Sequence, residues 1–289
     1  MRCGRAGAGA LLVAMVILGG CKASDMGGKG AKETDTIFEM FSPPTPAEAA
    51  AWAADPYDAD KRARGILMLA NAPWGGERVY VDLYRAAVND GDPGVRAVAV
   101  RALSLHGSPE DVAVIVEQLP SNDRLLRWEA ARALQRLHHP DAIDPLIQAI
   151  DPKHETDEAI RAECATALGQ YAEGKVLDAL ISAMGDHDLG VNRAALESLR
   201  TLTGADHGYD VRAWVAWRGE VEQPFAGRTA YIYPVFHRDP TWVEKILPFW
   251  KPPNEIAAAP VGMTNPVGAG PSASTGSGEP ASDQPVRNN

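Results

Sequence analysis

One short pattern, an Asp followed four residues later by an Arg, recurs along the chain and constrains its fold more than any other feature. The pairs are Asp60/Arg64, Asp92/Arg96, Asp123/Arg127 and Asp157/Arg161, and Asp188/Asn192 keeps the spacing with Asn in place of Arg. Successive Asp residues are 32, 31, 34 and 31 positions apart. A near-constant step in the thirties predicts an array of small stacked units, and such arrays more often form binding surfaces than catalytic clefts.

Each Asp from the second pair onward lies three residues before the first apolar residue of a narrow helical stripe. Around Arg127, for example, Leu126, Ala130 and Leu134 have the spacing of one buried helix face. An Asp at this place can accept a free backbone N–H, and its charge suits the positive end of the helix dipole. We therefore expect a helix to begin at each of these Asp residues.

A second apolar stripe precedes each of these helices and repeats in the same register. Its members are Val112/Ile115/Val116/Leu119, Ile143/Leu146/Ile147/Ile150 and Leu177/Leu180/Ile181/Met184, with Tyr80/Leu83/Tyr84/Ala87 as a looser version. This i, i+3, i+4, i+7 spacing is typical of a helix with one buried face. The predicted unit is therefore a helix, a short turn and a second helix that begins with Asp.

The unit resembles the HEAT-like repeats, in particular the short variety of the bilin lyases. The resemblance is carried by the segments Asp92-Pro93-Gly94-Val95-Arg96-Ala97 and Ala130-Ala131-Arg132-Ala133-Leu134, and it covers residues 46–203. It implies an all-α fold, a right-handed α-α superhelix of about five helix pairs whose second helices line the concave side. It also implies a ladder that links neighbouring repeats through Asp92, Arg96, Asp123, Arg127, Asp157 and Arg161. Asn192 departs from the pattern, which suits a unit near the end of the stack.

Residues 1–20 have the features of a secretory signal. Two Arg residues precede an apolar run over residues 6–18, which is too short to be retained as a membrane span. The segment Leu18-Gly19-Gly20-Cys21 resembles the bacterial lipobox, which implies that Cys21 is acylated and becomes the mature N-terminus. Lys22 in the next position implies sorting to the outer membrane if the source is a diderm bacterium. The alternative is an ordinary signal peptide followed by an accidental Cys.

Charge and cysteine content argue against several classes of function. Removal of the two Arg residues in the signal would change the formal net charge from −10 to −12. Such an acidic chain is a poor ligand for nucleic acid and for anionic lipid, so the acyl chain would hold it at the membrane. After the signal and Cys21, Cys164 is the remaining cysteine. It occupies a stripe position that holds Ala in other repeats, so we expect a small core residue, no nucleophile and no disulfide.

Composition divides the rest of the chain into segments. We predict a flexible tether (21–45), the repeat array (46–203), a capping helix (204–220), an aromatic and Pro-rich strap (221–250) and a disordered tail (251–289). Trp214 and Trp217 lie on one side of the capping helix, where they can close the apolar end of the stack or, alternatively, stack on a ligand. The strap either packs along the array or serves as an exposed docking segment.

No set of residues has the spacing that catalysis or metal binding requires. His138-His139 and His154-Glu155 lie in predicted turns without an i, i+4 pair of histidines, so we expect no metal. Asp206-His207 has no nucleophile at a matching spacing. We therefore expect a protein that is not an enzyme and that uses no cofactor.

The outer face of the second helices is the more plausible functional surface. Trp128 occupies a place held by Ala97 and Ala162 in other repeats, Arg132 lies four residues later, and Arg101 repeats the Arg132 position one unit earlier. Trp and Arg contribute most of the binding energy in protein interfaces, so these three residues are our candidate protein-binding site. Alternatively, Trp128 fills a local gap between repeats.

These features together predict a lipid-anchored, monomeric scaffold that binds an unknown protein partner at the bacterial cell envelope, on the periplasmic face. We expect no nucleic acid among its partners. Two alternatives stay open. Some proteins with such repeats belong to chromophore-lyase complexes, which would make the chain a subunit of an enzyme complex, and a purely structural envelope lipoprotein would bind nothing specific.

Overall fold

The computed structural model describes residues 45–235 and 256–264. Contacts divide the chain into two units, and all described residues belong to the second, Pro44–Asn289. The predicted signal, Cys21, nearly all of the predicted tether, the later part of the predicted strap and most of the predicted tail lie outside the described residues.

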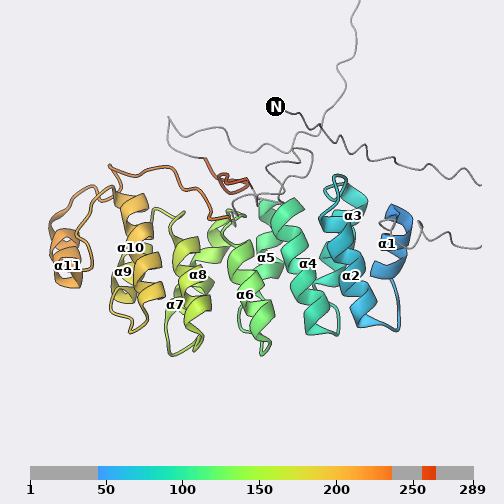
Figure 1. The fold of residues 1–289 in the computed structure, drawn as a ribbon. Helices are drawn as coiled ribbons and strands as arrows, with labels where there is room; N and C mark the ends of the chain where they lie inside the picture. The colour runs from blue at the N-terminus through green and yellow to red at the C-terminus, as the bar shows by residue number, and fades with distance from the viewer. Residues whose placement is uncertain (1–44, 236–255, 265–289) are drawn as a thin grey trace, which may run out of the picture. The chain divides into compact units, whose positions relative to one another are not determined.

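Helices follow one another in pairs, which confirms the predicted all-α fold with about five HEAT-like helix pairs (Figure 1). They are α1 Pro46–Ala53, α2 Ala59–Ala70, α3 Arg78–Ala87, α4 Pro93–His106, α5 Val112–Val116, α6 Arg124–Ala133, α7 Ile143–Ile150, α8 Glu158–Leu168, α9 Gly174–Ala183, α10 Leu189–Thr203 and α11 Val211–Glu220. Short 3₁₀ turns, η2 Pro109–Asp111 and η3 Pro140–Ala142, lead into α5 and α7. The described residues contain no strand, only an isolated bridge between Leu137 and Val261.

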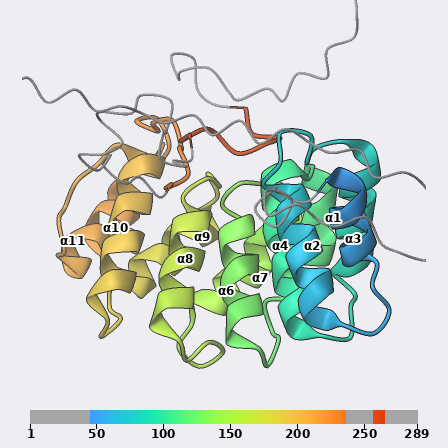
Figure 2. The same cartoon turned by 45° about the vertical axis from the view of Figure 1, so that its right-hand side comes forward.

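The helix pairs form two layers. The second helices α2, α4, α6, α8 and α10 contact one another in sequence order (Figures 1 and 2). Each first helix packs on the second helix of its own pair, and α11 adds a further helix against α9. Each apolar stripe is therefore covered by neighbouring helices, as expected for units that cannot bury their own stripe alone.

The predicted Asp residues begin their helices. Asp92, Asp123, Asp157 and Asp188 are the N-caps of α4, α6, α8 and α10, and each side chain accepts a backbone N–H of the first turn. In α6 the Leu126 nitrogen lies 2.8 Å from Oδ1 of Asp123. The carboxylates thus satisfy N–H groups that have no partner within the helix.

The first pair of the series requires a correction. Asp60 lies within α2, and the N-cap of this helix is Asp58, so the equivalent pair is Asp58/Arg62 and not Asp60/Arg64. The steps between N-cap residues then become 34, 31, 34 and 31. Two overlapping pairs with the same spacing are present in the sequence. Burial distinguishes them, because the Asp58 register places the fully buried Leu69 where α6 has Leu134.

The interior between the two layers consists mainly of Ala, Leu, Ile and Val. Cys164 is fully buried in α8, on the stripe where it was expected, and burial raises the pKa of its thiol. A neutral, sealed thiol behaves as a small apolar side chain.

Helix α11 covers the C-terminal end of the array. Trp214 is fully buried and its Nε1 donates to the carbonyl oxygen of Gly208 at 2.9 Å. Trp217 meets it edge to face, with ring centroids 5.6 Å apart. Because no part of the Trp214 ring is accessible, this pair covers the apolar end and cannot stack together on a ligand.

Beyond α11 the chain runs back past the C-terminal ends of the second helices (Figure 1). The Thr229 nitrogen donates to the Thr201 oxygen at 2.9 Å, and Nη2 of Arg228 donates to the Gln170 oxygen at 2.9 Å. Tyr231 is buried. The described part of the predicted strap therefore packs on the array.

Part of the predicted disordered tail is ordered against the array. In residues 256–264, Ala258, Ala259 and Met263 are buried. The Val261 nitrogen donates to the Arg136 oxygen at 2.8 Å, and its oxygen accepts from the His138 nitrogen at 2.9 Å. The segment is too poor in large apolar residues to indicate structure by itself, and its backbone partners lie more than a hundred residues earlier in the chain.

Candidate binding surface

Arginines of the repeat pattern link successive second helices. In each of three links, Nη1 donates to a carbonyl oxygen of the preceding turn, while Nε and Nη2 donate to one carboxylate of the next repeat. The links are Arg62–Asp90, Arg127–Glu155 and Arg161–Asp186. Both side chains of the last link are only 2% exposed, and Nε of Arg161 lies 2.9 Å from Asp186. Bidentate pairs of this kind are the strong form of charge-assisted hydrogen bond.

The ladder implied by the HEAT resemblance is thus present in part, with different acceptors. The carboxylate that receives each arginine lies two residues before the N-cap Asp, and it also accepts the backbone N–H of that Asp. Asp157 differs from the N-cap Asp residues of the other second helices because it also accepts from Arg124. An acidic residue two places before an N-cap is visible in the sequence and could have identified these acceptors.

The expected Arg96 link is not formed. Position 121, where the pattern calls for an acid, holds Ser, and Arg96 donates only to backbone oxygens of its own turn, at Asp90 and Gly91. The α4 and α6 repeats therefore lack the ladder pair between their second helices. Other pairs join them: Arg85 of α3 donates through Nε and Nη2 to Asp111 of η2, and Arg101 lies 3.8 Å from Glu129.

Trp128 and Arg132 lie one turn apart on α6 and are in contact. The guanidinium carbon of Arg132 is 4.7 Å from the centre of the Trp128 ring. Both side chains are half-buried, and Trp128 packs partly against the core. The residue thus fills space between repeats and also presents part of its ring, with the arginine above it, on the outer face of the second helices.

Arg101 and Arg132 both interact with one buried acid, Glu129, which sequence patterns did not indicate. Nη1 of Arg101 lies 3.8 Å from Oε1 of Glu129, which is 7% exposed. Burial raises the pKa of Glu129, and the charges of Arg101, Arg132 and Arg136 oppose this rise. Glu129 is therefore the common counter-charge of an arginine cluster that spans α4 and α6.

The surface continues from this cluster towards two later segments that pack on the array, the one that carries Tyr233 and residues 256–264. Arg136 is buried and its guanidinium carbon lies 4.8 Å from the ring centre of Tyr233. Gln135 donates to the backbone oxygen of Glu163 on α8, at 3.1 Å. Sequence patterns gave no indication of these contacts, because they depend on which helices become neighbours.

No metal site or membrane-spanning helix accompanies this surface in the described part of the chain. Residues 45–235 and 256–264 contain no group of three or more His, Cys, Asp or Glu side chains arranged to hold a metal ion. Within the same ranges, no helix combines the length and the apolar character needed to span a membrane.

Repeated helix pairs with an accessible outer face define a helical repeat protein with the properties of a scaffold. Comparison with known families identifies the repeats: the HEAT family matches residues 80–156, 112–200 and 143–215. Residues 80–215 therefore consist of HEAT-like repeats. No curated protein matches it.

Several solved structures resemble the chain at low identity. YibA of Escherichia coli is 20% identical, with 54% of this chain and 59% of YibA covered and a TM-score of 0.44. An engineered protein is 19% identical, with 61% of this chain and 52% of the engineered chain covered and a TM-score of 0.44. The complex of CpcE and CpcF of phycocyanin lyase from Nostoc sp. is 18% identical, with coverages of 61% and 97% and a TM-score of 0.28. The chain thus spans little more than half the length of the first two.

Proposed function

We propose that this protein is a lipid-anchored, non-enzymatic scaffold that binds one partner protein at the bacterial cell envelope through the Trp128–Arg132 surface. The array would act as a monomer and the partner would bind on the outer face of the second helices. HEAT repeats support the general role, since stacked helix pairs present extended binding surfaces.

The observation that carries this proposal is the stacking of Arg132 on Trp128 at 4.7 Å. The stack orders both side chains before a partner arrives, which lowers the entropy cost of binding. The Arg101 side chain nearby is 42% exposed, so the same face also offers an accessible charge. Trp and Arg are the residues most often found to dominate binding at interfaces.

Attachment to the membrane rests on the sequence alone. The lipobox-like ending at Cys21 and the Gly- and Lys-containing stretch after it support an acylated N-terminus on a tether, on the periplasmic face and at the outer membrane in a diderm bacterium. The acidic balance of the chain supports attachment through lipid over attachment through surface charge.

Crosslinking of the full-length protein in native membranes tests the proposal. We expect a stoichiometric partner whose recovery falls by roughly tenfold or more in Trp128→Ala and in Arg132→Glu, because each change removes one half of the stack. In the same cells, Cys21→Ser should move the protein from the membrane fraction to the soluble fraction.

Arg78→Glu is the matched control. It makes the same charge change as Arg132→Glu on a side chain of α3 that is 93% exposed, in the other helix layer. Recovery of the partner should stay at the wild-type level in this variant. Wild-type recovery in Trp128→Ala and Arg132→Glu, with unchanged helical circular dichroism, would show that the partner binds elsewhere.

A further inference from the structure

Because the ladder pair between α4 and α6 is absent, only one nitrogen of the Arg96 guanidinium donates a hydrogen bond within the described residues. Nη1 of Arg96 donates to the backbone oxygen of Asp90 at 2.9 Å, and the Nη1 atoms of the other ladder arginines also donate to backbone oxygens. Its Nε and Nη2 have no carboxylate partner among the described residues, and neither is among the buried nitrogen atoms that lack a partner there. Neither donor is therefore fully buried, at the place where three other arginines each hold an acid.

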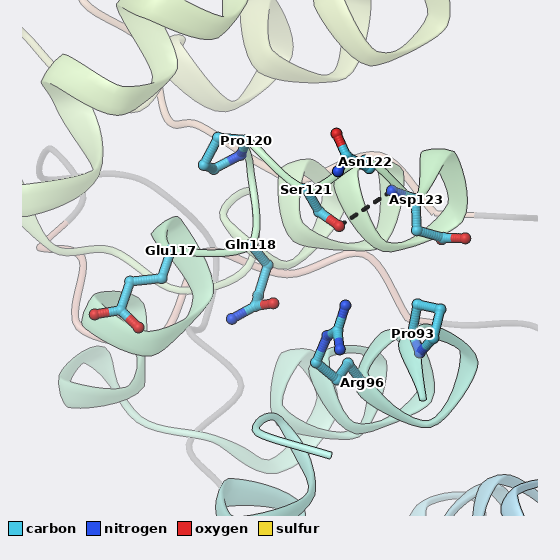
Figure 3. A pocket seen from close by; sticks show the side chains of 8 residues that line it. All are labelled: Pro93, Arg96, Glu117, Gln118, Pro120, Ser121, Asn122 and Asp123. Carbon is cyan, nitrogen blue, oxygen red and sulfur yellow. Dashed lines mark hydrogen bonds between the residues drawn. The ribbon is translucent and has the colours of Figure 1, made fainter. Parts of the chain in front are cut away.

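Ser121 takes over only one of the two roles of the absent acid. Its Oγ accepts the backbone N–H of Asp123 at 3.1 Å (Figure 3), as Glu155 does for Asp157 at 2.8 Å. The shorter Ser side chain makes no bond to Arg96. Ser121 therefore stabilises the turn before α6 as the acids do in the other repeats, but it does not accept from Nε or Nη2 of Arg96.

A hollow with a volume of about 600 Å³ lies at this position. Its lining includes Arg96, Gln118, Ser121 and Asn122, and Arg96 is half-buried. In Figure 3 the Arg96 guanidinium points towards the turn that carries Ser121, whereas the carboxylate of Glu117 points away from it. In the same view the Gln118 side chain and the Ser121 hydroxyl lie on the side of the hollow towards Arg96, whereas the Asn122 amide points away from it.

We propose that this hollow is a binding site for a carboxylate group, which accepts from Nε and Nη2 of Arg96. The ligand group takes the place that Asp90, Glu155 and Asp186 hold beside Arg62, Arg127 and Arg161. The fixed fork of a guanidinium matches the two oxygens of a carboxylate, so both hydrogen bonds form at once. The site lies apart from the Trp128 stack and needs no partner at that surface.

The charge of the surroundings favours a carboxylate over phosphate. Asp123 and Glu117 also line the hollow, and the whole chain carries a net charge of −10. Each added negative charge on a ligand increases repulsion from these acids, whereas Arg96 supplies one compensating positive charge. A group with a single negative charge fits this balance.

Binding can be followed on the full-length protein by NMR of the arginine Nε–H groups, with Arg96→Lys used to assign the signal. The probes are a glutamate blocked at both backbone ends, a short peptide that contains one Glu, a blocked glutamine and inorganic phosphate. We expect a saturable shift of the Arg96 signal with both Glu probes and none with glutamine.

Substitutions at Ser121 test the same site from within the chain. Ser121→Glu supplies the missing acid, so it should weaken binding of the Glu probes by roughly tenfold or more and raise the melting temperature by roughly 2–4 °C. Ser121→Gln has nearly the same size as Ser121→Glu without the charge, and should bind the Glu probes more tightly than Ser121→Glu does.

Each outcome has a definite meaning. A peptide that binds more tightly than blocked glutamate supports the site with a protein as the source of the carboxylate, and equal binding supports it with a free acid as the source. The proposal is overturned by the absence of a saturable shift, by wild-type binding in a folded Ser121→Glu, or by phosphate binding more tightly than the Glu probes. None of these results bears on the Trp128 surface, because the assay contains no partner protein.

Discussion

At the scale of single residues, acids that look alike in the sequence have different tasks. An N-cap Asp such as Asp188 closes the start of its own helix, while Asp186, two residues earlier, accepts an arginine of the preceding repeat. Asp186 and Arg161 are both almost fully buried. A buried pair of opposite charges is most important to stability when one member is lost, because the other is left without compensation.

We therefore expect Asp186→Asn to lower the free energy of unfolding by about 3–5 kcal/mol, because Arg161 would remain buried without a charged partner. Urea denaturation measures the change. Asp144→Asn is the control, since Asp144 pairs with Lys175 at 2.6 Å but its side chain is 80% exposed. The control should cost less than about 1 kcal/mol. Equal effects of the two substitutions would contradict a stabilising role for the buried link.

The same link predicts a pH dependence. Burial by itself would raise the pKa of Asp186, but the hydrogen bonds from Arg161 and from the Asp188 nitrogen outweigh it and hold the pKa below its usual value. The folded-state pKa is thus lower than that of the unfolded chain, about 4. The stability contributed by the ionised carboxylate is present above that pH and is lost as the pH falls through the folded-state pKa. Between neutral pH and pH of about 2, the wild type should therefore lose more stability than Asp186→Asn, and parallel curves would contradict this.

At the scale of helices, the close approach of α1 and α2 depends on a glycine. A Cβ atom added to Gly65 would lie 2.3 Å from the backbone nitrogen of Ala53 and 2.6 Å from the oxygen of Ala49. Both alanines are buried against α2. Because α1 carries small residues, it can pack closely on α2. It thereby shields the apolar face at the N-terminal end of the array from water, as a terminal repeat must.

Gly65→Ala should displace α1 and lower stability by about 1–3 kcal/mol, because the contact is with backbone that cannot move aside locally. Hydrogen exchange of the α1 amides should become faster, while exchange in α6 stays as in the wild type. Gly219→Ala in α11 is the control, since its Cβ would meet nothing within 4 Å. That change should be neutral or stabilise by up to about 1 kcal/mol through helix propensity. Protected α1 amides in Gly65→Ala would rule out this role of the glycine.

At the scale of the whole molecule, Gly262 allows residues 256–264 to pack on the middle of the array. Gly262 has a φ of +89°, and a Cβ added there would lie 2.5 Å from Cγ of Pro109 and 3.0 Å from the His138 oxygen. Glycine adopts this conformation without strain and permits the approach. The neighbouring Val261 then forms its two hydrogen bonds with the end of the α6 repeat.

Gly262→Ala should release this segment from the array. We expect faster hydrogen exchange at His138, whose nitrogen donates to Val261, with the amides inside α6 unchanged. Gly208→Ala is the control, because Gly208 also has a positive φ, of 55°, but its Cβ would meet nothing within 4 Å. Unchanged protection at His138 in Gly262→Ala would show that the segment is held by other contacts.

Features that depend on neighbouring residues could be predicted from the sequence. The N-caps Asp92, Asp123 and Asp157 and the capping box between Thr45 and Glu48 involve atoms within one helical turn. The contact of Arg132 with Trp128 is also local, because residues four apart share one face of a helix. The spacing of these signals was sufficient to predict the all-α array.

What only the tertiary structure decided are the contacts between residues far apart in the chain. Arg161 and Asp186 are 25 residues apart, and the partner of Arg127 is Glu155, 28 residues later. Both pairings exist because stacking brings the end of one repeat beside the start of the next. The same stacking shows that Arg96 has no such partner. Local spacing in the sequence thus determined the repeats, whereas the packing of one repeat on another decided which arginines of the repeat pattern are paired with an acid.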